Sequence, residues 1–118
     1  MKKIGIIHQT SAFNTSHGKE ALDLAMVMSA FEQDITVLFI GDGVFQVMRG
    51  QSPEAIQAKD YLSTIQALPF YDVEKLFVCE HSLHSRHLNT EQLIDDVTSK
   101  TQEEISELMT QFDEIYSF

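Results

Sequence analysis

Cys79 is the one cysteine of the chain and the side chain with the most direct chemical potential. It ends an apolar run at residues 76–79 and is followed by Glu80 and His81. A thiol at a strand end beside a histidine could become a thiolate nucleophile or carry a persulfide. Free cysteine is also often a small buried hydrophobe, and both interpretations stay open. A lone cysteine excludes an intrachain disulfide and a zinc site built from several cysteines.

Histidines are the second group of candidates. His81, His84 and His87 are spaced by three residues, which could suggest zinc ligation from one helical turn. The segment carries no HExxH pattern, so a solvated polar loop is the simpler interpretation. His8 follows an apolar run and is either a base for Cys79 or a structural histidine at a strand end. We expect no metal site.

Residues 10–18 lie between a predicted strand and a predicted helix. Their hydroxyl and amide groups could cradle an anion, as in flavodoxin-like nucleotide-binding modules. The segment lacks both GxGxxG and GxxxxGK[ST], and a helix cap at Ser16 explains its composition equally well. A flavin- or nucleotide-binding module is therefore the weakest hypothesis, and we expect no cofactor.

Composition limits the class of protein. The chain has 118 residues, which predicts a single domain spanning 1–118. Eight Lys and Arg against 18 Asp and Glu give a formal net charge of −10. Such an acidic surface is repelled by phosphate backbones and anionic lipid, so we expect no direct contact with nucleic acid or membrane. With no apolar run long enough for a signal core or a membrane span, we expect a cytoplasmic protein.

The order of the elements predicts an α/β fold. Predicted strands cover residues 4–7, 35–40, 76–79, 93–97 and 113–118, and predicted helices cover 19–31, 60–68 and the segment that begins at a capping box, Thr101 to Glu104. Short helical pieces are expected at 44–48 and after Pro53, and a loop at 80–90 with a turn at 81–85. Buried strands joined by helices favour a mostly parallel sheet covered on both faces. Its carboxyl edge would gather His8, the turn at 41–43 and Cys79.

The first predicted helix has almost no polar face. Nine of the eleven residues 21–31 are apolar, and only Asp23 and Ser29 interrupt them. An ordinary surface helix keeps a broad polar face, so the outer side of this helix is expected to be covered. Either a partner subunit covers it, or other segments of the same chain do.

Several segments together resemble a known family. They are residues 3–6 (KIGI), 41–46 (GDGVFQ), 53–55, Leu68 with 71–72, 77–79 with 82–83, and 112–113 with Phe118. Across nearly the whole chain these resemble the DsrE/F-like family, in particular its DsrF type. The resemblance implies a three-layer, flavodoxin-like α/β/α fold with five parallel strands. It also implies a strand order with the second strand between the first and third, which would separate His8 from Cys79.

The resemblance further implies a function. Such subunits assemble with TusB-like and TusD-like subunits into a dimer of heterotrimers, which relays persulfide sulfur between carrier proteins toward the 2-thiouridine of tRNA wobble positions. The family's sulfur-carrying cysteine belongs to the TusD-type subunit and matches Cys79 in position. Here Glu80 and His81 follow it, and a neighbouring carboxylate disfavours the thiolate. We therefore expect a structural and docking subunit without a catalytic residue. A persulfide carrier using Cys79 and a DsrF-type subunit in sulfur oxidation are the alternatives.

Overall fold

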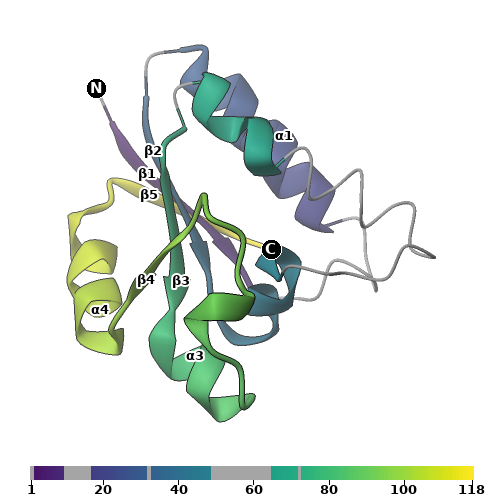
Figure 1. Cartoon of the computed structure of the whole chain (residues 1–118). Coiled ribbons are helices and arrows are strands. Elements are labelled where there is room, and N and C mark those ends of the chain that lie inside the picture. The colour runs from purple at the N-terminus through teal and green to yellow at the C-terminus, as the bar shows by residue number, and fades with distance from the viewer. Residues whose placement is uncertain (1, 10–16, 32, 49–64, 72) are drawn as a thin grey trace.

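The computed structural model contains a five-stranded parallel sheet of order β4-β3-β2-β1-β5 (Figure 1). It describes residues 2–9, 17–31, 33–48, 65–71 and 73–118. The strands are β1 (Lys3–His8), β2 (Asp34–Phe39), β3 (Lys75–Cys79), β4 (Thr98–Lys100) and β5 (Glu114–Ser117). The strand β2 lies between β1 and β3, as the family resemblance implies, so the carboxyl ends of these three strands share one edge.

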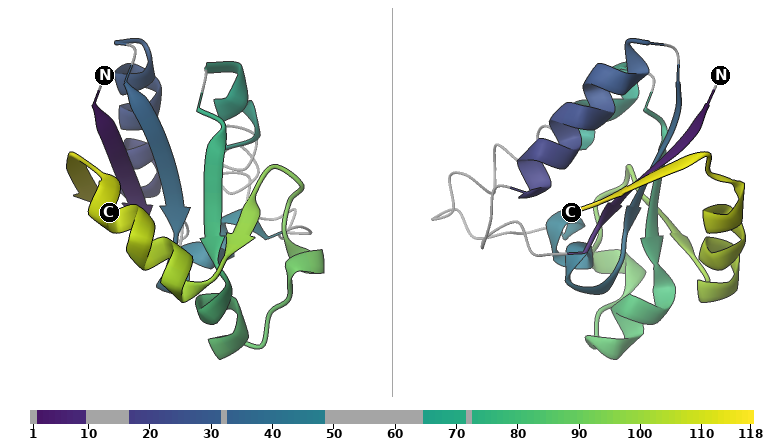
Figure 2. Two further views of the ribbon diagram at one scale, coloured as in Figure 1. Left: turned by 90° about the vertical axis from the view of Figure 1, so that its left-hand side faces the viewer. Right: turned by 180° about the vertical axis from the view of Figure 1, so that it is seen from behind.

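Helical segments cover both faces of the sheet. One face carries α1 (His17–Ser29), with η1 (Gly41–Val47) and η2 (Leu68–Tyr71), and the other carries α4 (Gln102–Gln111) (Figure 2). Short α3 (Glu80–Ser85) follows β3 at the carboxyl edge, and η3 (Thr90–Gln92) precedes β4. The predicted α/β/α architecture with five parallel strands is confirmed.

The alternation of side chains along each strand divides the core into two layers. On the α1 face, Ile4, Ile6, Val37 and Phe39 belong to the larger layer. On the α4 face, Ile7, Leu38, Cys79 and Ile105 form the smaller one. Because successive strand residues point to opposite faces, each of these strands contributes to both layers, and this explains why the central strands are mainly apolar.

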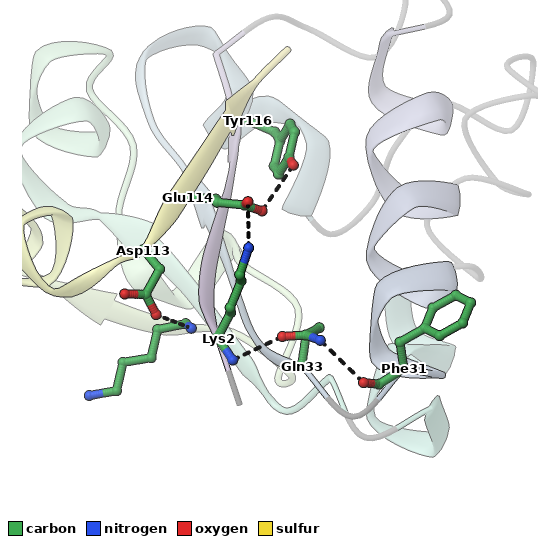
Figure 3. Close-up of polar contacts among 7 residues, drawn as sticks. Lys2, Phe31, Gln33, Asp113, Glu114 and Tyr116 are labelled. Atoms are coloured by element: carbon green, nitrogen blue, oxygen red, sulfur yellow. Dashed lines mark hydrogen bonds and ion pairs between the residues drawn. The ribbon is translucent and has the colours of Figure 1, made fainter.

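The ends of β1 and β5 are joined by polar contacts (Figure 3). The Lys2 ammonium lies 3.1 Å from Glu114 Oε1, and the Tyr116 hydroxyl donates to the other oxygen of that carboxylate at 3.0 Å. The Gln33 side chain accepts from the Lys2 amide at 2.9 Å and donates to the Phe31 carbonyl at 3.3 Å. These bonds fix the backbone at the end of α1, while the Phe31 ring points away from the polar cluster.

One predicted strand is wrong, and one predicted turn is a short helix. The predicted strand at 93–97 is instead a single antiparallel bridge between Leu93 and Met48, a turn at 95–96 and then the strand β4. Leu93 and Ile94 are buried in the core without forming a strand, whereas edge strand β4 needs few apolar residues. The predicted loop at 80–90 contains the helix α3 where a turn was expected at 81–85, and Leu83, which is 1% exposed, anchors this helix to the core.

Other predictions agree closely or lie outside the described residues. The capping box is present, with Thr101 Oγ1 accepting from the Glu104 amide at 3.1 Å and Glu104 accepting from the Thr101 amide at 3.0 Å. The helix α1 begins two residues before the predicted start. Of the helix predicted at 60–68, residues 65–67 are helical and η2 follows, while 60–64, the segment after Pro53 and residues 10–16 are not among the described ones. In the described ranges, no helix is long and apolar enough to cross a membrane.

Candidate functional site

The carboxyl edge of β1, β2 and β3 brings most of the candidate residues to one end of the sheet. His8 and Cys79 are the last residues of β1 and β3. The segments η1 and α3 begin directly after β2 and β3 and contact each other there. This edge is where open parallel sheets place their functional groups.

Cys79 is a packing residue within this chain. It is 6% exposed and lies in the smaller core layer with Ile7, Leu38 and Ile105. A reactive thiolate needs partial exposure and a stabilising positive environment, and apolar burial works against both. The burial therefore favours the interpretation of Cys79 as a small buried hydrophobe.

His8 is fully buried on the α1 face of the sheet, opposite to Cys79. Its ring stacks on Phe39 with centroids 4.8 Å apart, and both side chains point to the same face as the larger core layer. Burial lowers the pKa of His8 to about 4, against the opposing effect of a hydrogen bond with the Gln46 side chain. Because Cys79 faces the α4 side and β2 lies between the two strands, the structure does not bring His8 to Cys79 as a base.

The turn after β2 explains the glycines of the GDGVFQ run. Gly41 has a φ of 54°, a left-handed conformation that favours glycine. Gly43 lies so close to the His8 backbone that an added Cβ would collide with the His8 carbonyl group. The first glycine therefore permits the turn, and the second permits η1 to pack against the end of β1.

Arg86 is a residue that the sequence analysis missed. Its guanidinium donates to Asp42 Oδ1 and to the Ser82 carbonyl, and the Gly41 amide donates to Ser82 Oγ at 3.0 Å. These bonds tie α3 to η1 across the carboxyl edge. No local sequence signal indicates the pair, because its partners come from separate loops.

The three spaced histidines do not converge on one site. His81 and His84 are exposed, and His84 Nε2 lies 4.0 Å from the Glu80 carboxylate. His87 is also exposed and has a left-handed φ of 57°. Within the described part of the chain, no group of three or more His, Cys, Asp or Glu side chains could hold a metal ion. Most of the proposed anion loop, residues 10–16, lies outside the described residues.

Exposed apolar side chains also lie away from this edge, on α1, two residues after its end, and on η2. They are Val27, Phe31 and Phe70, which are 57%, 71% and 88% exposed, and we call these three residues together the α1–η2 surface. The helix α1 and the segment η2 lie side by side (Figures 1 and 2). Ala25 is buried and Leu24, Met26 and Met28 pack on the core, so the chain covers one side of the apolar helix and leaves the other exposed.

Fold and sequence together define the class. The sequence model of the DsrE/DsrF-like family matches residues 2–118, and the chain belongs to that family. A solved structure, that of the ychN protein from E. coli, superposes with a TM-score of 0.80 at 25% identity, covering 100% of both chains.

Named relatives give a narrower likeness. The chain is 39% identical over 118 residues to "Protein TusC homolog" of Aliivibrio fischeri, covering 100% of both sequences. It is 44% identical over 89 residues to "Protein TusC" of Escherichia coli O8, covering 75% of each, and 35% identical over 118 residues to the TusC homolog of Vibrio parahaemolyticus, covering 100% of each. The chain is thus similar to proteins named TusC, the DsrF type that its motifs resemble.

Proposed function

We propose that this chain is a subunit of a cytoplasmic sulfur-relay complex that passes persulfide sulfur between carrier proteins for 2-thiouridine synthesis at tRNA wobble positions. In this proposal it is mainly a structural and docking subunit. Support comes from full-length similarity to proteins named TusC and from membership of the DsrE/DsrF-like family. Its expected partners are TusB-like and TusD-like subunits, in a dimer of heterotrimers.

The observation that carries the proposal is the α1–η2 surface. A phenylalanine that is 88% exposed leaves most of its apolar area in water, and Phe31 and Val27 add to it. Burying apolar area is worth about 25 cal/mol per Å², so a protein that covers these side chains gains directly from doing so. Aromatic residues are also enriched in the buried centres of protein interfaces. A subunit contact is therefore the role that fits this surface.

The surroundings of Cys79 favour a structural role for this chain over a role as a sulfur carrier. The thiol is buried among aliphatic side chains, and His8 lies on the far face of the sheet. The net charge of −10 also favours action through protein partners over direct contact with tRNA. A persulfide carrier using Cys79 is the competing function, and a DsrF-type role in sulfur oxidation is another.

The assembly is tested by co-producing this chain with the TusB-like and TusD-like proteins of its own organism. Phe70→Asp is expected to abolish co-elution on a sizing column while the isolated chain keeps its melting temperature, because an exposed side chain contributes little to folding. The matched control is Ile115→Asp, on β5, where the side chain is 43% exposed. Dissociation by the control alone, or by neither variant, would contradict the proposed surface.

The role of the thiol is tested in cells. Cys79→Ser is expected to leave the level of 2-thiouridine in tRNA unchanged, with the complex intact on the sizing column. Loss of the thiolated nucleoside with an intact complex would instead assign a sulfur-carrying function to Cys79. Mass spectrometry of the complex during turnover, with a gain of one sulfur on this cysteine as the readout, would confirm that alternative.

A further inference from the structure

A groove lies on the α4 face of the sheet, between α4 and the strands β3 and β4. Its volume is about 250 Å³, and it is lined by Phe77 of β3, Lys100 of β4 and, from α4, Glu104, Glu107, Leu108 and Gln111. Among the described elements, α4 is the helix that covers this face, and it runs across the sheet from the end of β4 toward β5 (Figure 2). The apolar side chains of the groove, Phe77 and Leu108, are half-buried. The polar side chains that α4 contributes are exposed, and two of them are carboxylates.

The groove already holds a cation from its own chain. The Lys100 ammonium lies 4.8 Å from the centroid of the Phe77 ring and 3.9 Å from Glu104 Oε2. An aromatic face with a carboxylate beside it attracts a cation through the ring quadrupole and through charge together. The lining therefore has the chemistry of a cation-binding site.

One carboxylate of the groove, that of Glu107, is not neutralised by Lys100. Lys100 is matched by Glu104, while Glu107 has no ion-pair partner among the residues that the structure describes. Gln111, one turn further along α4, adds an amide oxygen on the same wall. An occupant with a positive head and an apolar stem would satisfy the carboxylate and cover Phe77 and Leu108 at once.

We infer that this groove binds an arginine side chain presented by a partner protein. Arginine fits better than lysine, because its planar guanidinium can lie on an aromatic ring and donate to Glu107 and Gln111 from separate nitrogens. The inference does not rest on the proposed assembly, since the α1–η2 surface lies on the other face of the sheet. The small, charged contact is typical of a transient partner, whereas the apolar α1–η2 surface suits a permanent one.

The groove lies close to Cys79 on the same face of the sheet. Phe77 and Cys79 are two residues apart on β3 and point to the same face, and Lys100 is the register partner of Cys79. A protein held by the groove would therefore lie over the part of the sheet that contains the thiol. The groove places a visiting partner next to the carboxyl edge rather than at a remote surface.

The test uses the full chain and small probes, with two-dimensional NMR of the ¹⁵N-labelled protein. N-acetyl-arginine amide is expected to cause saturable shifts at the amides of Lys100, Glu104, Leu108 and Gln111, with a dissociation constant in the millimolar range. N-acetyl-citrulline amide, the neutral isostere, is expected to cause none. Equal shifts for both probes, or no saturable shift with arginine, would overturn the inference.

Matched variants localise the effect. Glu107→Gln is expected to weaken arginine binding by about tenfold, the loss of one charge-assisted hydrogen bond. Glu103→Gln, an equal change of charge on α4 outside the groove, is expected to leave it unchanged. Lys100→Met removes the competing ammonium and is expected to tighten binding. Equal weakening by Glu103→Gln and Glu107→Gln, or weakening by Lys100→Met, would contradict the proposed site.

Other occupants give distinct results in the same experiment. N-acetyl-lysine amide binding as tightly as the arginine probe would define a general cation site and overturn the assignment to arginine. Tighter binding of free L-arginine would point to a small molecule instead of a protein segment. Shifts of the same amides with protein concentration alone would assign the groove to a second copy of this chain, and each of these results contradicts the inference.

Discussion

Arg86 and Asp42 are joined by two hydrogen bonds to a single carboxylate oxygen. The guanidinium Nε and Nη2 donate to Asp42 Oδ1 at 3.1 and 3.0 Å, although the residues are 44 positions apart in the chain. The third guanidinium nitrogen donates to the Ser82 carbonyl at 3.1 Å. One side chain therefore connects α3 to the turn after β2 and holds the carboxyl edge together.

Replacing the two members of this pair should have unequal effects. Arg86→Ala is expected to lower the free energy of unfolding by about 1–2 kcal/mol, because it also removes the donor to the Ser82 carbonyl. Asp42→Ala is expected to cost less than about 1 kcal/mol, since the carboxylate is 63% exposed and an exposed ion pair is weak. Urea denaturation measures both. Equal losses would show that the carbonyl contact contributes nothing.

The two glycines of the η1 turn should respond to alanine for different reasons. Gly43→Ala places a Cβ against the His8 carbonyl group, so we expect a loss of about 2–3 kcal/mol from a forced backbone shift. Gly41→Ala makes only ordinary van der Waals contacts, with the Gln9 carbonyl and the Arg86 guanidinium, but it keeps a left-handed φ, and we expect a loss of about 1 kcal/mol. Thermal unfolding of both variants checks the order. A larger loss at Gly41 would contradict the packing argument.

Buried His8 predicts a pH dependence of stability. Burial lowers the pKa of the folded state to about 4 from 6.5, so the unfolded chain binds the extra proton between these values. This contribution to stability is complete above pH 6.5 and is lost as the pH falls toward 4. The loss is about 3 kcal/mol over that range. His8→Gln should remove it, and parallel stability–pH curves for the two proteins would contradict the prediction.

His87 occupies the place that glycine usually takes after a helix. The His87 and Leu88 amides donate to the His84 and Leu83 carbonyls at 3.1 and 2.9 Å, the pattern of a Schellman motif. His87→Val is expected to destabilise the chain by about 1–2 kcal/mol, because a β-branched residue tolerates a positive φ poorly. His87→Gly is expected to be neutral or stabilising. Chemical denaturation of the pair tests this, and a stabilising valine would be inconsistent with it.

The burial of Cys79 predicts slow chemical modification. Iodoacetamide at neutral pH is expected to label the thiol far more slowly in the folded chain than in urea, because access requires opening of the layer formed with Ile7, Leu38 and Ile105. The measurement is intact-mass spectrometry over time. A thiol labelled equally fast in both conditions would be exposed and would favour the carrier alternative.

Sequence patterns predicted the elements whose information is local. The apolar runs of β1, β2 and β3 are each continuous, and the reciprocal bonds of Thr101 and Glu104 require only a spacing of three residues. The fourth strand was placed wrongly at 93–97, because apolar Leu93 and Ile94 are buried by a single bridge and a bond to the Val47 carbonyl. An apolar pattern indicates that residues are buried, but buried residues such as Leu93 and Ile94 need not form a strand.

Only part of the candidate site could be predicted from sequence patterns. The sequence identified His8 and Cys79 as strand-end residues, and the family resemblance supplied the strand order that separates them. It missed Arg86 and the groove beside Phe77, since the partners in each come from different elements. A contact between distant segments leaves no periodic trace in the sequence.

By itself, the sequence determined the α/β class, the acidic charge, the single thiol and the presence of an apolar first helix. Only the tertiary structure decided which side chains of each strand face which core layer. It places His8 and Cys79 on opposite faces of the sheet, and it brings Phe77 and Lys100 together in one groove. The physical reason is that composition and periodicity act within a segment. Register, strand order and helix placement arise from packing between segments, which fixes the neighbours of every side chain.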